Sequence, residues 1–153
     1  DMLLHYVEDL AEAEGERARD VLRASLCLSA DVNAAFDPTF PDAFEANNAS
    51  YMNRGPVLTK YTGSRGKSGS NDASAETMQR VIKYMDDEKV MWQIGELGKV
   101  DLGGGGTVAM FIANCNIDTL DIGVPVISMH APFEVVSKVD VYSAYEAFKA
   151  FTK

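Results

Sequence analysis

The sequence predicts an α/β fold in which a mixed, largely parallel sheet is flanked by helices. Short apolar runs, such as residues 25–33 and 124–129, have the length and composition of buried strands. Between them lie segments with helical periodicity, of which residues 74–89 are the clearest. The apolar residues that recur there at i, i+3, i+4 and i+7 are Met78, Val81, Ile82 and Met85. The chain has 153 residues, 46% of them hydrophobic, which suits one globular domain with a sizeable core.

Each element has its own local signal. Apolar periodicity or capping residues predict helices over residues 2–14, 16–25, 74–89, 107–116 and 138–151. Short apolar runs predict strands over residues 25–33, 56–62, 90–96, 118–123 and 124–129. Ser137 is the expected N-cap of the last helix, one face of which should carry Val141, Tyr145, Phe148 and Phe151. Residues 34–55, which include two prolines and three asparagines, form a loop whose length suggests a functional role.

Composition excludes several functional classes. The formal net charge of −9 argues against a protein that binds the phosphate backbone of nucleic acids. No apolar run approaches the roughly 18–20 residues that a membrane span needs, and no stretch has the pattern of a signal peptide. Cys27 and Cys115 are too few for a disulfide framework and lie in apolar or helical contexts. They favour reduced, buried thiols in a cytoplasmic protein.

The segment GSRGKSGS, residues 63–70, contains Gly-Lys-Ser between a predicted strand and a predicted helix. A phosphate-binding loop needs a further glycine five residues before that Gly-Lys pair. This position is Tyr61, so the match fails. Two interpretations stay open. The segment is a mobile basic loop, or it faces a substrate whose anionic groups would contact Lys60, Arg65 and Lys67.

Four glycines, residues 103–106, precede the helix predicted over residues 107–116. Glycine permits positive φ and close approach of the backbone, and a helix N-terminus favours an anion. Gly105, Gly106 and Thr107 are therefore candidates for contacts with a substrate or an oxyanion. A purely structural packing role explains such a run equally well.

Asp31 and His130 each follow an apolar strand in the sequence. In α/β sheets, sites form in the loops beyond the carboxyl ends of the strands. The carboxylate and the imidazole could therefore share a metal site, although each could also be an ordinary capping or surface residue. His5 lies among charged residues of a helix and is expected to be a solvated surface histidine. Two ligands are too few for a catalytic zinc.

Several longer segments resemble one known family. The stretches LSADVNAAFDPTF, RGPVLTKYTG, ELGKVDLGGGGT and GVPVISMHAPFEVVSKVDVY follow one another in the chain. Together they resemble the aminopeptidase I / aspartyl aminopeptidase family of dinuclear zinc metallopeptidases, over essentially the whole chain. The resemblance implies two divalent metal ions, zinc first, with cobalt or manganese as alternatives. It also implies a peptide substrate and, for the intact family protein, a homo-oligomer of twelve tetrahedrally arranged subunits.

The resemblance further implies roles for the two candidate ligands. Family members hold their metals with five residues, in chain order a histidine, a bridging aspartate, a glutamate, an aspartate and a histidine. By this resemblance Asp31 is the fourth ligand and His130 the fifth, each on a different metal. A further glutamate, adjacent to the liganding one, is the general base. Members differ in preferring acidic or neutral N-terminal residues, so the substrate preference stays open.

The chain departs from the family pattern in one important respect. The first three ligands and the general-base glutamate are expected upstream of its first residue, and no Glu-Glu dipeptide occurs in it. We therefore expect residues 1–153 to form a single domain, the C-terminal portion of a metallo-aminopeptidase catalytic domain, with no catalytic residue of its own and, alone, little metal affinity. The alternative is a non-catalytic α/β module that acts through self-association or peptide binding.

Overall fold

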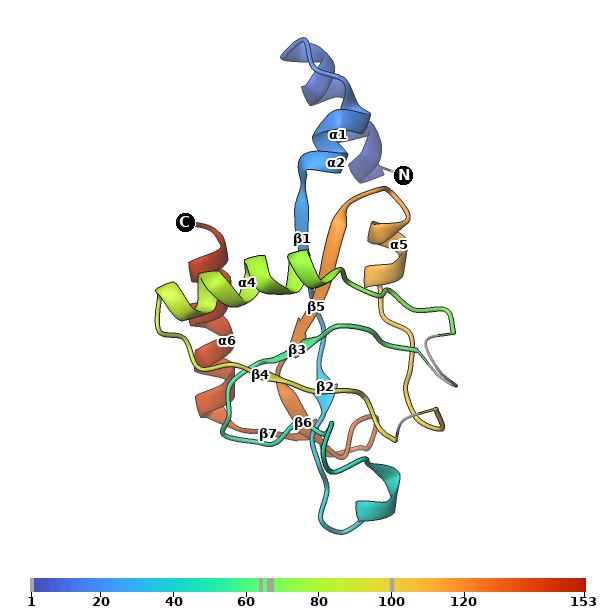
Figure 1. Ribbon diagram of the computed structural model, residues 1–153, viewed down its shortest axis with the longest axis vertical. Helices are drawn as coiled ribbons and strands as arrows, with labels where there is room; N and C mark the ends of the chain where they lie inside the picture. Colours follow the sequence, from blue (N-terminus) through green and yellow to red (C-terminus); the bar gives the residue numbers. More distant parts are fainter. Residues whose placement is uncertain (1, 64, 66–67, 100) are drawn as a thin grey trace.

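The computed structural model describes residues 2–63, 65, 68–99 and 101–153 (Figure 1). Its helices are α1 (Met2–Ala13), α2 (Ala18–Ala24), the 3-10 helix η1 (Pro41–Ala43), α4 (Ala75–Asp87), α5 (Ala109–Ala113) and α6 (Lys138–Phe151). Its strands are β1 (Leu26–Ala30), β2 (Asn33–Ala34), β3 (Val57–Thr59), β4 (Gln93–Ile94), β5 (Asp118–Gly123), β6 (Pro125–Ile127) and β7 (Val135–Val136).

The strands form two mixed sheets. The first has the order β1-β5-β3-β4, in which β1 is parallel to β5, β3 is parallel to β4, and β3 is antiparallel to β5. The second has the order β2-β6-β7, with β2 parallel to β6 and β6 antiparallel to β7. One chain segment runs through β1 and then β2, and another runs through β5 and then β6. These two segments lie side by side in both sheets (Figure 1). The predicted mixed α/β class is confirmed.

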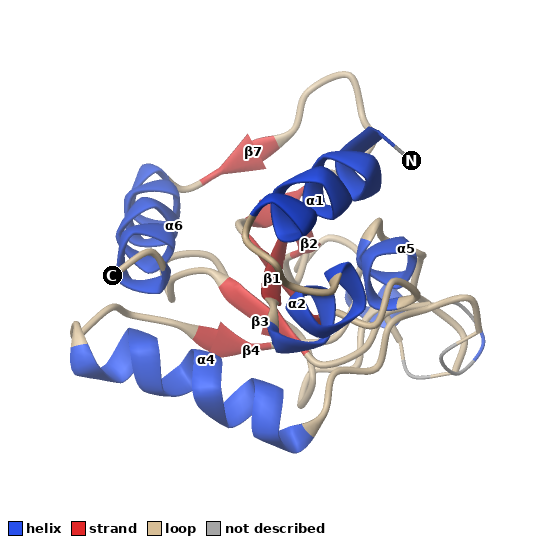
Figure 2. Ribbon diagram, turned by 90° about the horizontal axis from the view of Figure 1, so that it is seen from above, coloured by secondary structure: helices blue, strands red, loops and turns tan. Residues whose placement is uncertain are grey.

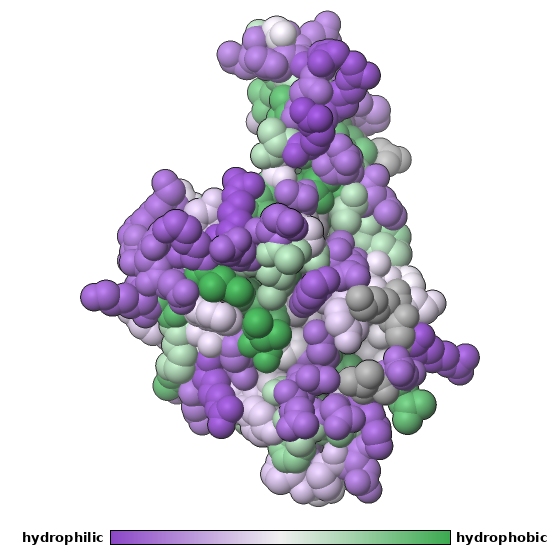
Figure 3. Space-filling view, viewed as in Figure 1, coloured by the Kyte–Doolittle hydropathy of each residue, from purple (hydrophilic) through white to green (hydrophobic). Residues whose placement is uncertain are grey.

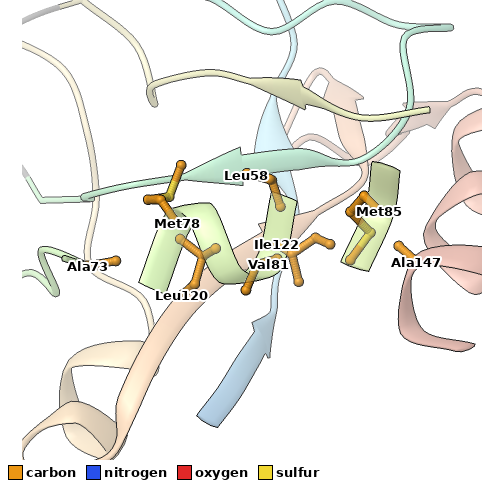
Figure 4. Close-up of a cluster of buried hydrophobic side chains, with 8 residues drawn as sticks. All are labelled: Leu58, Ala73, Met78, Val81, Met85, Leu120, Ile122 and Ala147. Carbon is orange, nitrogen blue, oxygen red and sulfur yellow. The ribbon is translucent and has the colours of Figure 1, made fainter. Parts of the chain in front are cut away.

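The core lies between one face of the larger sheet and the helices α4 and α6. Figure 4 shows its members, which come from two strands, two helices and the turn before α4: Leu58, Ala73, Met78, Val81, Met85, Leu120, Ile122 and Ala147. The stripe predicted on residues 74–89 is confirmed, since its methionines and valine are buried. The Ser74 hydroxyl begins this helix by accepting a hydrogen bond from the backbone N–H of Thr77 (3.0 Å). In the view of Figure 2, α5 lies away from α4 and α6.

The predicted face of α6 is wrong in part. Val141 and Tyr145 are about half exposed or more, at 47% and 60%, whereas Asp140, Ala144 and Ala147 are buried. The helix approaches its neighbours through small side chains, which allow close packing. The periodicity of large apolar residues therefore predicted correctly that Phe148 packs against the core, but not that Val141 and Tyr145 are exposed.

The N-terminal helices α1 and α2 lie at one end of the molecule, beyond the start of β1 (Figure 1). Ala11 is the buried residue of α1, and Met2, Leu3 and Tyr6 are exposed. On the face drawn in Figure 3, hydrophilic side chains cover most of these helices and of α4, with apolar patches between them. Among the described residues, no helix combines the length and the apolar character needed to cross a membrane.

Candidate functional site

Asp31 lies between β1 and β2, at the carboxyl end of the first strand. Its backbone N–H donates to the carbonyl oxygen of Ile122 (3.2 Å), so it continues the pairing of β1 with β5. The side chain is exposed, and its Oδ1 accepts a hydrogen bond from the backbone N–H of Val32 (2.7 Å). Gly123 lies opposite, where an added Cβ would come within 1.6 Å of the Asp31 carbonyl oxygen. The backbone of Asp31 can therefore lie this close to β5 only because residue 123 is a glycine.

His130 lies in a tight turn three residues beyond the end of β6. The backbone N–H of Ala131 donates to the carbonyl oxygen of Ser128 (3.0 Å), and Glu134 accepts a hydrogen bond from the backbone N–H of His130. His130 has a φ of +67°, which is uncommon for a residue with a side chain. Such backbone conformations are frequent at functional sites. The turn presents the imidazole as an exposed side chain.

The two candidate ligands come after strands that belong to two neighbouring segments of the chain. Asp31 comes after β1, and His130 comes after β6, which continues the β5 partner of β1. A carboxylate oxygen and an imidazole nitrogen are donors that zinc accepts. Two donors are too few for a metal site. The part of the chain that the structure describes contains no group of three or more His, Cys, Asp or Glu residues arranged for a metal. The donor types fit a zinc centre, but these residues alone do not complete one.

The candidate cations differ in their surroundings. The Lys60 ammonium forms an ion pair with the carboxylate of Asp72, so its charge is already balanced. Arg65 is exposed and has a φ of +54°. Lys67 lies outside the described residues. Contacts of these residues with a substrate stay a prediction.

The glycine segment and the basic loop meet in the structure. The backbone N–H of Gly63 donates to the carbonyl oxygen of Gly105 (2.7 Å). A Cβ added at Gly106 would lie 3.4 Å from the carbonyl oxygen of Gly69. Two stretches that the sequence singled out separately are therefore adjacent. The helix that follows, α5, is only five residues long, so its dipole adds little to anion binding at this place.

Asp121 is a buried carboxylate that the sequence reasoning missed. It is 4% exposed and lies on β5, level with Ser29 of β1 and Thr59 of β3. The hydroxyl of Thr107 donates a hydrogen bond to its Oδ2 (3.0 Å). Burial raises the pKa of Asp121, the hydroxyls of Ser29 and Thr107 act in the opposite direction, and the charge of Asp31 raises it further. The available signal was an acidic residue in mid-strand, between Leu120 and Ile122.

The raised pKa of Asp121 predicts a specific dependence of stability on pH. The folded state holds this proton more tightly than the unfolded chain does. Its stabilising effect is therefore complete below the ordinary aspartate pKa of about 3.9 and is lost as the pH rises through the folded-state pKa. Asp121→Asn cannot ionise. Its advantage in free energy of unfolding over the original chain should be smallest near pH 4 and should grow toward pH 7.

Urea unfolding of both proteins across this pH range measures the difference. The other titrating groups are common to both proteins and largely cancel. A difference that stays constant from pH 4 to pH 7 would contradict the raised pKa of Asp121.

The two cysteines, which were predicted to be buried, are only partly so. Cys27 and Cys115 are both free and partly buried. Burial raises the pKa of the Cys27 thiol, and the nearby Asp121 carboxylate adds to the effect. Both effects disfavour the thiolate form of Cys27.

Two donors that zinc accepts therefore lie beyond strand ends of a mixed α/β fold, and comparison with known proteins identifies the family. Residues 2–152 match the family described as aminopeptidase I zinc metalloprotease (M18). The chain belongs to the M18 family.

Relatives and solved structures agree with this assignment. A probable M18 family aminopeptidase 1 of Clostridium acetobutylicum is 47% identical over 135 residues, which are 88% of this chain and 29% of the relative. The crystal structure of the Thermotoga maritima M18 aminopeptidase matches with a TM-score of 0.93 and 38% identity, over 99% of this chain and 35% of that one. A structure described as the mApe1 dodecamer of S. cerevisiae shares the fold at 21% identity and a TM-score of 0.70, over 88% of this chain and 28% of that one. The chain spans about a third of the length of these proteins.

Proposed function

We propose that this chain is the C-terminal portion of the catalytic domain of an aminopeptidase, and that it supplies Asp31 and His130 as ligands to a centre of two divalent metals. The supporting observation is that the fold matches an M18 aminopeptidase with a TM-score of 0.93, and that Asp31 follows β1 and precedes β2, whose parallel partner β6 leads to His130. Zinc is the first candidate metal, because the family is described as zinc metalloproteases. Cobalt and manganese are the alternatives.

Each residue of the chain has a defined task in this proposal. When bound, the metals would polarise the scissile carbonyl and lower the pKa of a bound water. The hydrogen bond from Val32 holds the Asp31 carboxylate in place, and the turn stabilised by Glu134 holds His130. The backbone of residues 105–107 would contact the peptide. Arg65 and Lys67, with Lys60 in its ion pair, are the candidates for recognising an acidic N-terminal side chain.

The general base is not assigned to this chain. The family pattern places that role on a glutamate beside a liganding glutamate, and no Glu-Glu dipeptide is present. One ligand per metal leaves most coordination positions to water. We therefore propose that residues 1–153 by themselves bind metal weakly and do not hydrolyse peptides.

A chimera tests the proposal. Residues 2–152 would replace the matching segment of the Clostridium acetobutylicum relative, so that the remaining part of a family protein is present. We expect metal-dependent release of N-terminal residues from peptides. In this chimera Asp31→Ala or His130→Ala should lower kcat/KM at least about 100-fold, since each removes a metal ligand. Metal content per subunit, measured on the purified protein, should fall as well.

Matched controls separate the ligands from other acids and histidines. Asp42→Ala and His5→Ala replace an exposed aspartate and an exposed histidine elsewhere, and both should leave kcat/KM unchanged. The isolated 153-residue chain should show no submicromolar zinc binding by calorimetry. An active chimera that keeps its activity after Asp31→Ala and His130→Ala are combined would show that the two residues are not the ligands. Submicromolar zinc binding by the isolated chain, lost on His130→Ala, would show that the chain builds a metal site alone.

Assembly and location follow the same proposal. One relative is described as a dodecamer, and we propose a homo-oligomer for the protein in which this chain completes its metal centre. The free thiols of Cys27 and Cys115 support a cytoplasmic location.

A second candidate function is binding without catalysis. It is favoured by the apolar side chains that α1 leaves exposed, with Met2 at 88%, Leu3 at 62% and Tyr6 at 61%. Sedimentation of the isolated chain discriminates between the two functions. Association that Leu3→Lys abolishes would favour the binding module, and a monomer at every concentration would count against self-association.

A further inference from the structure

Asp121 faces away from the hydrophobic core. Successive side chains of a strand point to opposite faces of the sheet. Leu120 and Ile122, on either side of Asp121, both belong to the core beneath α4 and α6. The Asp121 carboxylate therefore points to the other face, where the hydroxyl of Thr107 meets it.

Only one of the two oxygens of the Asp121 carboxylate has a clear hydrogen-bond donor among the described residues. Its Oδ2 accepts from Thr107, whereas its Oδ1 makes no hydrogen bond of ordinary geometry within the described part of the chain, although the Ser29 hydroxyl lies near enough to lower the pKa of the carboxyl. A buried polar group without a partner costs stability. An apolar side chain would avoid this cost, so a polar side chain at this place calls for a role outside the core.

The segment that Thr107 ends has little rigidity of its own. Residues 103–106 are all glycine, and glycine has the widest backbone freedom of any residue. Among the described residues, two hydrogen bonds hold its second half to the rest of the protein. One is the backbone bond from Gly63 to Gly105, and the other is the side-chain bond from Thr107 to Asp121. The second bond reaches β5 two residues before Gly123, against which the backbone of Asp31 lies.

We propose that Asp121 is a positioning residue, which binds Thr107 and so sets the place of the backbone of residues 105–107 relative to Asp31. The charge of Asp31 contributes to the raised pKa of Asp121, in keeping with two carboxylates near enough to interact. The proposal rests on the proposed function in one respect, namely that a peptide substrate contacts residues 105–107. Asp121 itself contacts neither substrate nor metal in this arrangement.

Hydrogen exchange in the isolated chain tests the positioning step without any need for activity. Thr107→Val keeps the shape of the side chain and removes its hydroxyl. It should speed amide exchange of Gly63, whose N–H donates to the carbonyl oxygen of Gly105, about tenfold, as the loss of one hydrogen bond predicts. Amides of β5 in the core should keep their rates. Thr107→Ser retains a hydroxyl and Asp121→Asn retains an acceptor oxygen, so both should exchange as the original chain does.

Two outcomes would overturn the positioning step. Unchanged exchange of the Gly63 amide in Thr107→Val would show that the bond between Thr107 and Asp121 does not hold the segment. Equal acceleration of the β5 amides would show a general loss of stability instead.

The chimera described above tests the consequence for substrate. Thr107→Val should lower kcat/KM about tenfold with the metal content unchanged, and Thr107→Ser should restore it. Loss of activity together with metal would overturn the inference, because the effect would then lie in the metal centre. An unchanged kcat/KM would overturn it too. A chimera that is inactive before any substitution contradicts the proposed function, while the exchange measurement still decides whether Asp121 positions the segment.

Discussion

Gly123→Ala is expected to unfold the chain or to leave it with a small fraction of its stability. A Cβ at this position would lie 1.6 Å from the carbonyl oxygen of Asp31, 2.6 Å from its carbonyl carbon and 3.0 Å from the Cα of Val32. All three contacts are with backbone, which no rotamer change relieves. The backbone of Asp31 and Val32, just after β1, would have to move away from β5. We expect a loss of at least about 3 kcal/mol in the free energy of unfolding.

Urea unfolding, followed by the fluorescence of Trp92, measures this loss. Gly105→Ala is the matched control for stability. Its Cβ would meet only the flexible end of Leu97, at 3.5 Å, so the change should stay below about 1 kcal/mol. Equal stability of the two variants would show that β1 and β5 do not approach as described. Because Gly123 is also the residue opposite Asp31, such a result would remove the structural basis for the position of that candidate ligand.

Asp140→Ala is expected to cost about 3 kcal/mol, because it leaves two backbone amides without an acceptor. Asp140 lies in the first turn of α6 and is fully buried. One carboxylate oxygen accepts from the N–H of Asn53 (2.7 Å) and the other from the N–H of Gly55 (2.8 Å). This carboxylate therefore joins the last helix to the turn that precedes β3.

Asp140→Asn provides the comparison for this prediction. The amide retains one acceptor oxygen in nearly the same shape, so about half of the loss should return. Chemical denaturation of both variants at pH 7 measures the difference. If Asp140→Ala and Asp140→Asn lose the same amount, the two-sided acceptor role of this carboxylate is wrong.

Elements with strong local signals could be predicted from the sequence. Ser74 as N-cap and the methionines and valine of α4 combine two signals that agree, and the helix lies where they indicate. The apolar runs before Asp31 and around residue 120 correctly predicted β1 and β5. Predicted strands were longer than observed at residues 90–96, where β4 is only Gln93–Ile94. The end of a strand is set by its pairing with a neighbouring strand, and this pairing cannot be read from the sequence of one segment.

The candidate site, too, could be predicted from the sequence only in part. Asp31 and His130 were identified as candidate ligands because segments of the chain resemble a known family. This family is confirmed over residues 2–152. The role of these two residues as ligands is still a prediction. The contact between Gly63 and Gly105 and the burial of Asp121 could not be read from the sequence, because each involves residues more than ten positions apart.

The sequence by itself determined the α/β class, the order of most elements, the family and the two candidate ligands, because apolar periodicity, capping and contiguous motifs are local properties of the chain. Only the tertiary structure decided which face of α6 is buried, that Gly123 admits the backbone of Asp31, and that Asp121 holds Thr107. These three features depend on how closely two backbones approach and on what surrounds a buried carboxylate. Both quantities are set by contacts between distant segments, and they arise only when the sheet and its helices have assembled.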